Sequence, residues 1–437
     1  MEWWTSLIFL ISLLMVLFLS GLPVAFSFFL MNIIGAVVFM GGPFALKQLI
    51  LSIYDSLAVF VFAPVPLFIL MGELMFHSKM ANKAMDVLEM WLGKIPGRLG
   101  LVAIIGGTIF ASLTGSQMAN TAMLGSTLTP AMQARGYSRD MSMGPVLGAG
   151  GIAIMIPPSS LAVILGSLAY IPISRILIGG ILPGLMMAFF YTGYVVLRCV
   201  LNPGIAPIYD LERVTWRRKL AALAKYVLPL GLVVFLVIGL ILLGVATPSE
   251  SAALGVFGTM FLGYLYGGLK KRQIIDSIAG TCKVTVAVFM IIAGATFFSQ
   301  LLSFTGAGRG LVNYVVEMQL SPMLVLAGMM IVLLFLGCFM EQVCMMMITI
   351  PLFMPIVQRL GFDPLWFGIM MLITLEIAAT SPPFGLNLFV MKGVAPEGTS
   401  MTEIYLAALP YIGCDLIVLT IVALFPQLAL FLPNTIK

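Results

Sequence analysis

The sequence predicts an all-α polytopic membrane protein built from two related units in opposite orientations. Of its 437 residues, 61% are hydrophobic and only 9% are charged, whereas soluble domains carry about 25% charged residues. The mean hydropathy is +1.14. Because a span needs about 20 apolar residues, the chain has room for about ten to fourteen crossings. The first stretch, MEWWTSLIFLISLLMVLFLS, starts with acidic and aromatic residues rather than the basic ones of a targeting peptide, so we expect it to be the first span.

The composition also argues against several classes of protein. The five cysteines are scattered without metal-ligand spacing, and His77 is the only histidine. A zinc site, a haem or a histidine-based acid–base pair is therefore not expected. No paired aspartates or Ser–His pair indicate an enzyme. The net charge of +5 does not indicate a nucleic-acid partner, because the basic residues follow membrane topology instead.

A repeat with an offset of 225 residues runs through the chain. The segments AMQARGY and IVQRLGF align at this offset, and helix-breaking prolines recur at the same distance. The matched prolines are Pro23 and Pro248, Pro130 and Pro355, Pro157 and Pro382, and Pro158 and Pro383. Biased composition alone would not keep these prolines in step, and many secondary transporters are built from such repeats.

Each unit is predicted to hold an odd number of crossings, so that the second unit is inverted with respect to the first. Both units contain a re-entrant hairpin followed by a broken span, and a cytoplasmic linker joins them. The first unit is predicted to cover residues 1–200, with its hairpin near 99–131 and its broken span near 141–170. The linker covers residues 201–225. The second unit covers residues 226–437, with its hairpin near 322–358 and its broken span near 365–395.

The distribution of basic residues supports this topology. With both chain ends on the periplasmic side, only five of the 22 lysines and arginines fall on that side: Lys47, Arg175, Arg309, Arg359 and Lys437. The remainder fall on the cytoplasmic side, which is the asymmetry that the positive-inside rule predicts. Two amphipathic segments, FALKQLILSIYDS and KKRQIIDSIAGTCK, are expected to form helices along the two membrane surfaces.

Polar residues gather in the middle of both hairpins, next to the broken spans. The hairpin tips read FASLTGSQMANTAMLGSTLTP and FLGCFMEQVCMMMITIPLFMP. The broken spans, GAGGIAIMIPPSSLAVILGS and TLEIAATSPPFGLNLFV, each carry a double proline that ends one half-helix and begins another. Carbonyl groups before such a break carry partial negative charge, and amides after it carry partial positive charge. A break beside a polar tip can therefore bind a cation and an anion.

Sodium is the expected cation, because the first tip lacks the carboxylates that calcium sites gather. Two pseudo-symmetric sodium sites are expected, one at each tip. The first comprises Ser112, Thr114, Ser116 and the backbone at Ile156 and Pro157, and the second comprises Gly337, Glu341, Ala378, Thr380 and Ser381. The candidates for binding an anionic substrate are Ser116, Asn120, Ser159, Ser160, Gly385 and Asn387.

Several ionisable residues admit two interpretations. Glu341 and Glu376 fall within predicted membrane depth, where ionisable groups are functional by default, yet Glu376 could equally hydrogen-bond a neighbouring helix. Glu250 is expected to cap a helix rather than to bind a ligand. Arg309 fits the steering of an anionic substrate and interfacial anchoring equally well, and the role of Asp415 stays open.

Six motifs together resemble one family across nearly the whole chain. They are PLFILMGELM, GGTIFASLTGS, GAGGIAIMIPPSS, ATPSESAALG, PIVQRLGFDPLWFGI and SPPFGLNLFV. In this order they resemble the large membrane subunit of tripartite ATP-independent periplasmic (TRAP) transporters. The resemblance implies an elevator-type fold, in which a body of hairpins and broken helices slides against a scaffold of the other spans.

The resemblance also implies a function and partners. It implies sodium-coupled uptake of an organic anion across the bacterial inner membrane, with the substrate delivered by a periplasmic binding protein. It implies a small membrane subunit, which we expect as a separate chain. The family's sodium sites fall at the hairpin tips and broken helices, which correspond here to Ser112, Ser116, Gly337, Thr380 and their neighbours.

Two departures from the family pattern bear on the substrate. Many members carry an aspartate where this chain has Asn120, and the sialic-acid carriers use an arginine in the span that corresponds to GATFFSQLLSFTG, which contains none. A small carboxylate or sulfonate therefore fits better than sialic acid. The alternative to a TRAP transporter is a sodium–anion symporter of related fold that works without a binding protein.

Overall fold

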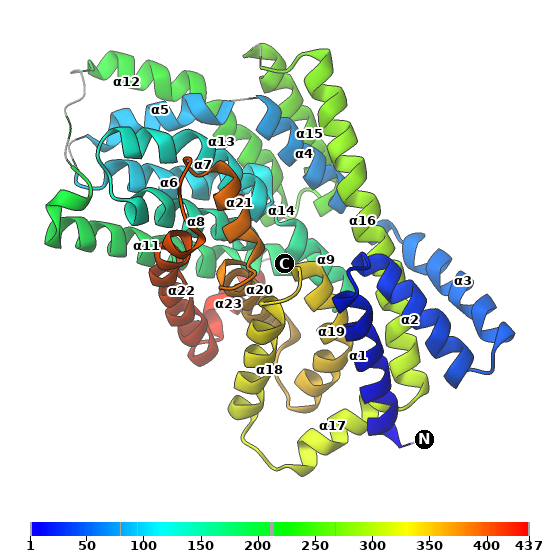
Figure 1. Cartoon of the computed structure of the whole chain (residues 1–437). Coiled ribbons are helices and arrows are strands. Elements are labelled where there is room, and N and C mark those ends of the chain that lie inside the picture. The colour runs from blue at the N-terminus through cyan, green and yellow to red at the C-terminus, as the bar shows by residue number, and fades with distance from the viewer. Residues whose placement is uncertain are drawn as a thin grey trace.

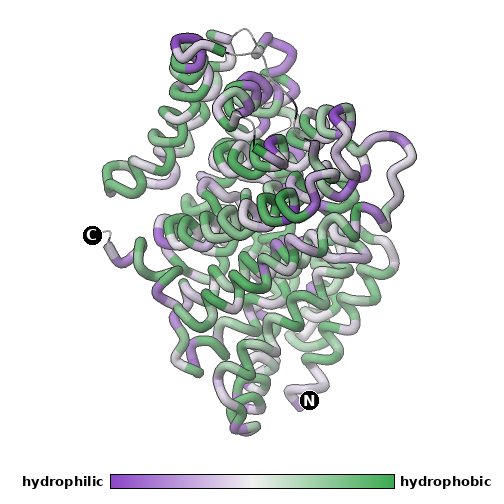
Figure 2. Tube along the Cα trace, turned by 90° about the vertical axis from the view of Figure 1, so that its left-hand side faces the viewer, coloured by the Kyte–Doolittle hydropathy of each residue, from purple (hydrophilic) through white to green (hydrophobic). Residues whose placement is uncertain are grey.

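The computed structural model describes residues 2–78, 80–93, 95–207, 209, 214–266 and 268–435. Within these ranges all the regular secondary structure is helical, and turns and short extended segments join the helices. Lys79, Lys94, Arg213 and Lys437, which contribute to the charge asymmetry above, lie outside them. Seven helices in the described ranges are long and apolar enough to cross a membrane, and five shorter apolar helices accompany them. Figure 2 shows hydrophobic residues over most of the helical body, with hydrophilic residues gathered towards one end.

The first half of the chain contains eleven α-helices. They are α1 (Trp3–Leu19), α2 (Val24–Phe39), α3 (Pro43–Leu57), α4 (Pro64–Ser78), α5 (Met80–Leu92), α6 (Arg98–Thr114), α7 (Gln117–Ala134), α8 (Arg139–Met155), α9 (Ser160–Leu168), α10 (Ile173–Gly179) and α11 (Ile181–Leu201). Two short 3₁₀ turns, η1 (Phe60–Phe62) and η2 (Pro203–Ile205), precede α4 and follow α11.

The second half begins with a helix that two π-helical turns interrupt. Its parts are α12 (Trp216–Ala222), η3 (Leu223–Val227), α13 (Leu228–Val234), η4 (Phe235–Gly239) and α14 (Leu240–Leu242). The helices that follow are α15 (Pro248–Leu265), α16 (Lys271–Phe304), α17 (Ala307–Glu317), α18 (Pro322–Gly337), α19 (Gln342–Arg359), α20 (Pro364–Thr380), α21 (Leu386–Val394), α22 (Met401–Leu424) and α23 (Gln427–Thr435).

The helix bounds follow the 225-residue offset closely. Helices α7 and α19 begin at Gln117 and Gln342, and α8 and α20 end at Met155 and Thr380. The two predicted hairpin ranges coincide with the helix pairs α6–α7 and α18–α19. The inverted orientation of the two units stays a prediction, because it requires the membrane as a reference.

The double prolines end α8 and α20 where the sequence places them. Proline has no amide hydrogen to donate and its ring clashes with the preceding turn, so α8 gives way to extended backbone at Ile156. Helix α9 starts again after Ser159, whose hydroxyl accepts a hydrogen bond from the amide of Ala162 at 3.2 Å. Backbone carbonyls on one side of each break and amides on the other are thereby left outside the helices.

Two groups of helices can be followed in Figure 1. In the first, α16 packs against α2, α3 and α4, and α15 packs against α4. In the second, which we call the hairpin body, α8 packs against α6, α7, α20 and α22, both α18 and α19 pack against α20, and α9 packs against α19. Every residue of α8 from Met141 to Met155 and of α20 from Leu365 to Thr380 is buried. These two helices therefore form the centre of the hairpin body.

One expectation about surface helices is wrong. The segment KKRQIIDSIAGTCK does not form a separate helix, because α16 continues without a break from Lys271 to Phe304. Its 34 residues extend about 51 Å, well beyond the roughly 30 Å of a hydrocarbon core. No proline or glycine pair interrupts it, whereas in the first unit Pro64 starts α4 separately after α3 has ended at Leu57.

Candidate functional site

The tip of the first hairpin contacts the first helix break. Gly115 ends α6 in a left-handed conformation with φ of 59°. The carbonyl oxygen of Gly115 accepts hydrogen bonds from the Ser160 amide at 3.3 Å and from the Ser160 hydroxyl at 3.0 Å. A Cβ atom added to Gly115 would lie 2.6 Å from the carbonyl oxygen of Pro158. The close approach of the two backbones therefore requires glycine at this position.

The residues predicted for the first sodium site lie around this contact. Ser112 and Thr114 are 5% and 3% exposed, and the Thr114 hydroxyl donates to the Phe110 carbonyl at 3.0 Å. Ser116 starts α7, and its hydroxyl accepts from the Ala119 amide at 3.4 Å. Ile156 lies at the adjoining end of α8. Buried hydroxyls at Ser112 and Thr114 and a partly buried hydroxyl at Ser116 therefore lie on either side of Gly115, next to the first helix break.

The tip of the second hairpin contacts the second break in the same way. A Cβ atom added to Gly337 would lie 2.1 Å from the Cβ atom of Ala378, so the end of α18 lies directly on α20. The Cys338 thiol lies 3.6 Å from the carbonyl oxygen of Pro382. Glu341 starts α19 as its N-cap, because its Oε2 atom accepts from the Val343 amide at 3.1 Å.

The hydroxyl groups of the second predicted sodium site are already hydrogen-bonded within α20. Thr380 donates to the carbonyl oxygen of Glu376 at 2.6 Å, and Ser381 donates to that of Ile377 at 2.6 Å. A hydroxyl that donates its hydrogen still has a lone pair to offer to a cation. Of the five predicted residues, Gly337 and Ala378 are in direct contact, while Glu341 lies at the start of α19 and Thr380 and Ser381 lie at the end of α20.

The residues predicted to bind substrate separate into two groups. Ser116, Ser159, Ser160 and Gly385 lie at the hairpin tip or at the breaks. Asn120 is fully buried, and its amide nitrogen donates to the carbonyls of Gly107 at 3.1 Å and Ala149 at 2.9 Å.

Asn387 is also buried, and its amide nitrogen lies 3.4 Å from the carbonyl oxygen of Leu147. The Oδ1 atoms of Asn120 and Asn387 have no hydrogen-bond partner among the described residues. The nitrogen of each side chain therefore ties helices together, and in this conformation only the oxygen is free for a ligand.

Two residues at the centre of the site were not predicted from the sequence. The Nε2 atom of Gln342 donates to Oε1 of Gln117 at 2.9 Å, and Nε2 of Gln117 donates to Oε2 of Glu376 at 2.7 Å. Gln117 and Gln342 are separated by the repeat offset and follow Ser116 and Glu341. That equivalence was visible in the sequence, but their mutual contact depends on how the two hairpins meet.

The carboxylates that the sequence left open are both buried in the hairpin body. Glu376 is 0% exposed and Asp415 is 1% exposed. Asp415 accepts a hydrogen bond from the Tyr191 hydroxyl, and the Tyr191 ring packs against that of Tyr411 with centroids 5.2 Å apart. No lysine, arginine or histidine forms an ion pair with either carboxylate within the described ranges. Glu376 thus accepts a hydrogen bond from Gln117 of a neighbouring helix, and a functional role for it stays a prediction.

Glu250 caps a helix, as predicted. The Thr247 amide donates to Oε2 of Glu250 at 2.8 Å, and the Glu250 amide donates to the Thr247 hydroxyl at 3.3 Å. This reciprocal pair begins α15. Hydrogen bonding from the backbone and side chain of Thr247 lowers the pKa of the Glu250 carboxyl from its ordinary value.

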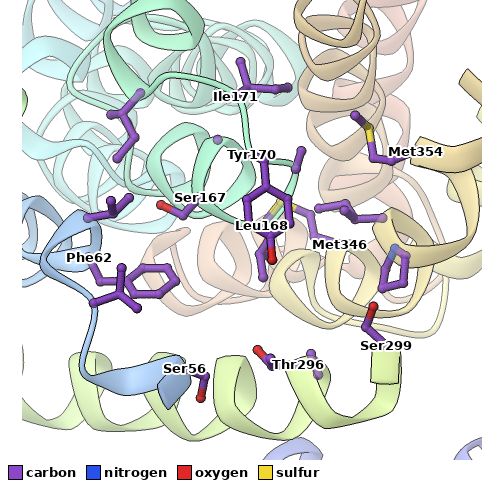
Figure 3. A pocket seen from close by; sticks show the side chains of 18 of the residues that line it. Ser56, Phe62, Ser167, Leu168, Tyr170, Ile171, Thr296, Ser299, Met346 and Met354 are labelled. Atoms are coloured by element: carbon purple, nitrogen blue, oxygen red, sulfur yellow. The ribbon is translucent and has the colours of Figure 1, made fainter. Parts of the chain in front are cut away.

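A cavity of about 1090 Å³ lies between the hairpin body and the other helices. Its walls come from α3, η1, α16, α19 and the turn between α9 and α10. Figure 3 shows the Tyr170 ring in its middle, with Ser299 and Thr296 of α16 and Met346 of α19 around it. Its lining includes the carboxylate of Asp55 and, among the residues that the structure describes, no lysine or arginine. None of the six predicted substrate residues lines it, although Met346 lies only a few residues beyond the second hairpin tip.

Comparison with known proteins gives a consistent result. Residues 11–428 match the model of the family described as "Tripartite ATP-independent periplasmic transporter, DctM component". The C4-dicarboxylate TRAP transporter large permease protein DctM of Pseudomonas aeruginosa is 31% identical over 91% of this chain and 92% of its own length. The ectoine TRAP transporter large permease protein TeaC of Halomonas elongata is 28% identical over 95% of this chain and 96% of its own.

Other similar proteins extend the comparison. The isethionate TRAP transporter permease protein DctMQ of Oleidesulfovibrio alaskensis is 29% identical over 95% of this chain and 66% of its own length. Among solved structures, the YdaH transporter of Alcanivorax borkumensis matches with a TM-score of 0.63 at 13% identity, over 88% of this chain and 89% of that one. MtrF of Neisseria gonorrhoeae matches with a TM-score of 0.61 at 13% identity, over 88% of this chain and 85% of that one. At such identity these two structures show similarity of fold alone.

Proposed function

The chain belongs to the DctM family of TRAP transporter large permease subunits, and from that premise we propose that it performs sodium-coupled secondary active uptake of an organic anion across the bacterial inner membrane. As a member of this family it is a multi-pass membrane protein and a transporter permease, not an enzyme. The observation that carries the proposal is the contact of each hairpin tip with a helix break: the Gly115 carbonyl meets Ser160, and Cys338 meets the Pro382 carbonyl.

These two contacts support two sodium sites, one formed around Ser112 and Ser116 and the other around Gly337 and Thr380. Their oxygens are neutral hydroxyls and carbonyls, apart from the Glu341 carboxylate at the second tip. Neutral oxygens at the ends of broken helices suit a monovalent cation in a cavity lined by protein. The amides after each break provide positive partial charge for the substrate anion.

The substrate is proposed to be a small carboxylate or sulfonate. The relatives named above are carriers of C4-dicarboxylates, isethionate and ectoine by their descriptions, and each of these compounds carries a carboxylate or a sulfonate. No lysine or arginine occurs among the described residues that line the cavity, so in this proposal the positive charge for the anion comes from the amides after the helix breaks, which lie outside that lining.

We propose that transport follows an elevator mechanism, with the hairpin body as the moving part. The cavity between this body and α3 and α16 supports a boundary along which one part slides against the other. Helix α19, which leads to the second tip, forms one wall of this cavity. With both chain ends periplasmic, the Tyr170 turn faces the periplasm, where a substrate-binding protein would deliver its ligand.

Two partners complete the proposal: a small TRAP membrane subunit encoded as a separate chain, and a periplasmic substrate-binding protein. The test is uptake of labelled C4-dicarboxylates and sulfonates into proteoliposomes that contain both membrane subunits, with the binding protein added outside. Accumulation that needs an inward sodium gradient and the binding protein is expected. Uptake without the binding protein would favour a symporter that works alone, and uptake with a proton gradient but no sodium would overturn the coupling.

A further inference from the structure

A chain of hydrogen bonds crosses the centre of the hairpin body and joins its two halves. Gln342 donates to Gln117 at 2.9 Å, and Gln117 donates to Glu376 at 2.7 Å. Gln117 and Gln342 are each 5% exposed and Glu376 is 0% exposed. Since solvent does not reach these groups, no water molecule replaces a partner that moves away, and a buried polar group left unpaired costs about 1–3 kcal/mol.

The middle residue of this chain lies beside the first proposed sodium site, and its two ends lie beside the second. Gln117 directly follows Ser116 at the first tip, and Gln342 directly follows Glu341 at the second. The Oε1 atom of Glu376 accepts from the Thr380 hydroxyl at 3.2 Å. A shift of either tip therefore changes the bonds that hold the other tip and the end of α20.

The middle residue, Gln117, is hydrogen-bonded at both ends of its side-chain amide. The Gln117 side chain uses its oxygen to accept from Gln342 and its nitrogen to donate to Glu376, so both ends of one planar amide are engaged. Gln342 is held in addition by a bond to the Leu375 carbonyl at 3.0 Å. A rotation of the Gln117 amide that improves one contact lengthens the other.

We propose that the chain Gln342–Gln117–Glu376 couples the two sodium sites, so that occupation of one site raises the affinity of the other. This inference rests on the proposed function, which supplies the two sites. Coupling of this kind is reciprocal, so sodium at either tip has the same effect on the other. The three residues act as positioning residues, since they hold the two tips in the geometry that binds sodium.

The test is a sodium titration of the purified protein at constant ionic strength, read as the change in Tm and fitted for its Hill coefficient. The unaltered protein is expected to give a coefficient above one. Gln117→Met keeps a similar side-chain volume and removes both bonds, so the coefficient is expected to fall to one and the half-saturating sodium concentration to rise about fivefold or more. Glu376→Gln keeps an acceptor for Gln117 and is expected to retain a coefficient above one.

A matched control is available on the same helix. Gln133 of α7 donates to the Ser142 hydroxyl at 3.4 Å, outside the chain of bonds, and Gln133→Met is expected to leave the Hill coefficient unchanged. A purely structural role of Gln117 would lower Tm at every sodium concentration without changing the shape of the curve.

Two results would overturn the coupling and leave sodium binding in place: a Hill coefficient of one in the unaltered protein, or an unchanged coefficient in Gln117→Met. Absence of any sodium effect in the unaltered protein would overturn the proposed function itself, which is a distinguishable outcome. If Gln117→Met does not fold, Gln342→Met removes the link between the tips together with the bond to the Leu375 carbonyl, and it carries the same expectation for the Hill coefficient.

Discussion

Replacing Gly151 by alanine tests the packing of the two central helices of the hairpin body. Gly151 lies within α8, and its repeat equivalent 225 residues further on is Glu376 of α20. A Cβ atom added to Gly151 would lie 1.7 Å from Oε1 and 2.0 Å from Cδ of Glu376, where ordinary contact begins at 3.4 Å. The carboxyl group therefore occupies the space that a side chain at position 151 would need.

The free energy of the change has two opposing parts. Glycine to alanine inside a helix ordinarily stabilises by about 1 kcal/mol. Overpacking costs about 1–3 kcal/mol, and loss of the 2.7 Å bond from Gln117 to the carboxylate costs about 1.5–3 kcal/mol. We expect Gly151→Ala to destabilise the protein by about 1.5–5 kcal/mol in total.

The assay is thermal unfolding in detergent, with Gly193→Ala as the control. A Cβ atom on Gly193 of α11 meets nothing within 4 Å, so this variant is expected to gain about 0.5–1 kcal/mol. The double variant Gly151→Ala with Glu376→Ala is expected to lose less than the sum of the two single variants, because the clash is gone. A Gly151→Ala protein as stable as the unaltered one would refute this account of the α8–α20 contact.

Three further predictions concern the hairpin tips and the ion pair between Arg139 and Glu403. Gly115→Ala is expected to destabilise the protein by about 1–2 kcal/mol, because alanine is strained in the left-handed conformation and its Cβ atom would lie 2.6 Å from the carbonyl oxygen of Pro158. The measurement is Tm, and an unchanged Tm would contradict this expectation. Ser112→Ala and Thr380→Val are each expected to raise the sodium concentration needed for half-maximal uptake about tenfold, because the loss of one sodium ligand is expected to cost about 1.4 kcal/mol. If both variants showed the same sodium dependence as the unaltered protein, these residues would not be sodium ligands. Arg139 donates a hydrogen bond to Glu403 at 2.6 Å, and both side chains are partly exposed. Glu403→Gln should therefore lower Tm at low salt and change it less at high salt, because salt screens an exposed ion pair; an equal effect at both salt concentrations would argue against this ion pair.

Several parts of the fold could be predicted from the sequence because they depend on local chemistry. The prolines at Pro157 and Pro382 end their helices wherever the helices pack, so the broken spans were predictable. The same holds for the cap at Glu250, which needs only Thr247 and the first turn of α15. The continuous α16 was not predicted, since nothing in an amphipathic pattern shows whether a helix stops before the next apolar segment.

The centre of the site could not be predicted, because it depends on tertiary packing. The bond between Gln117 and Gln342 joins residues from both halves of the chain, and the sequence shows only that they are equivalent. The cavity around Tyr170 has walls from segments as distant as α3 and α19. The bonds from the amide nitrogen of Asn120 to α6 and α8 also depend on packing, and the predicted contact of Asn120 with substrate stays a prediction.

The most direct test of sodium coupling is thermal unfolding of the purified protein in sodium against potassium at constant ionic strength. The account predicts a saturable stabilisation by sodium of about 1–3 kcal/mol at excess ion, which Ser112→Ala and Thr380→Val each reduce. Equal stability in the two ions would contradict sodium binding at the hairpin tips.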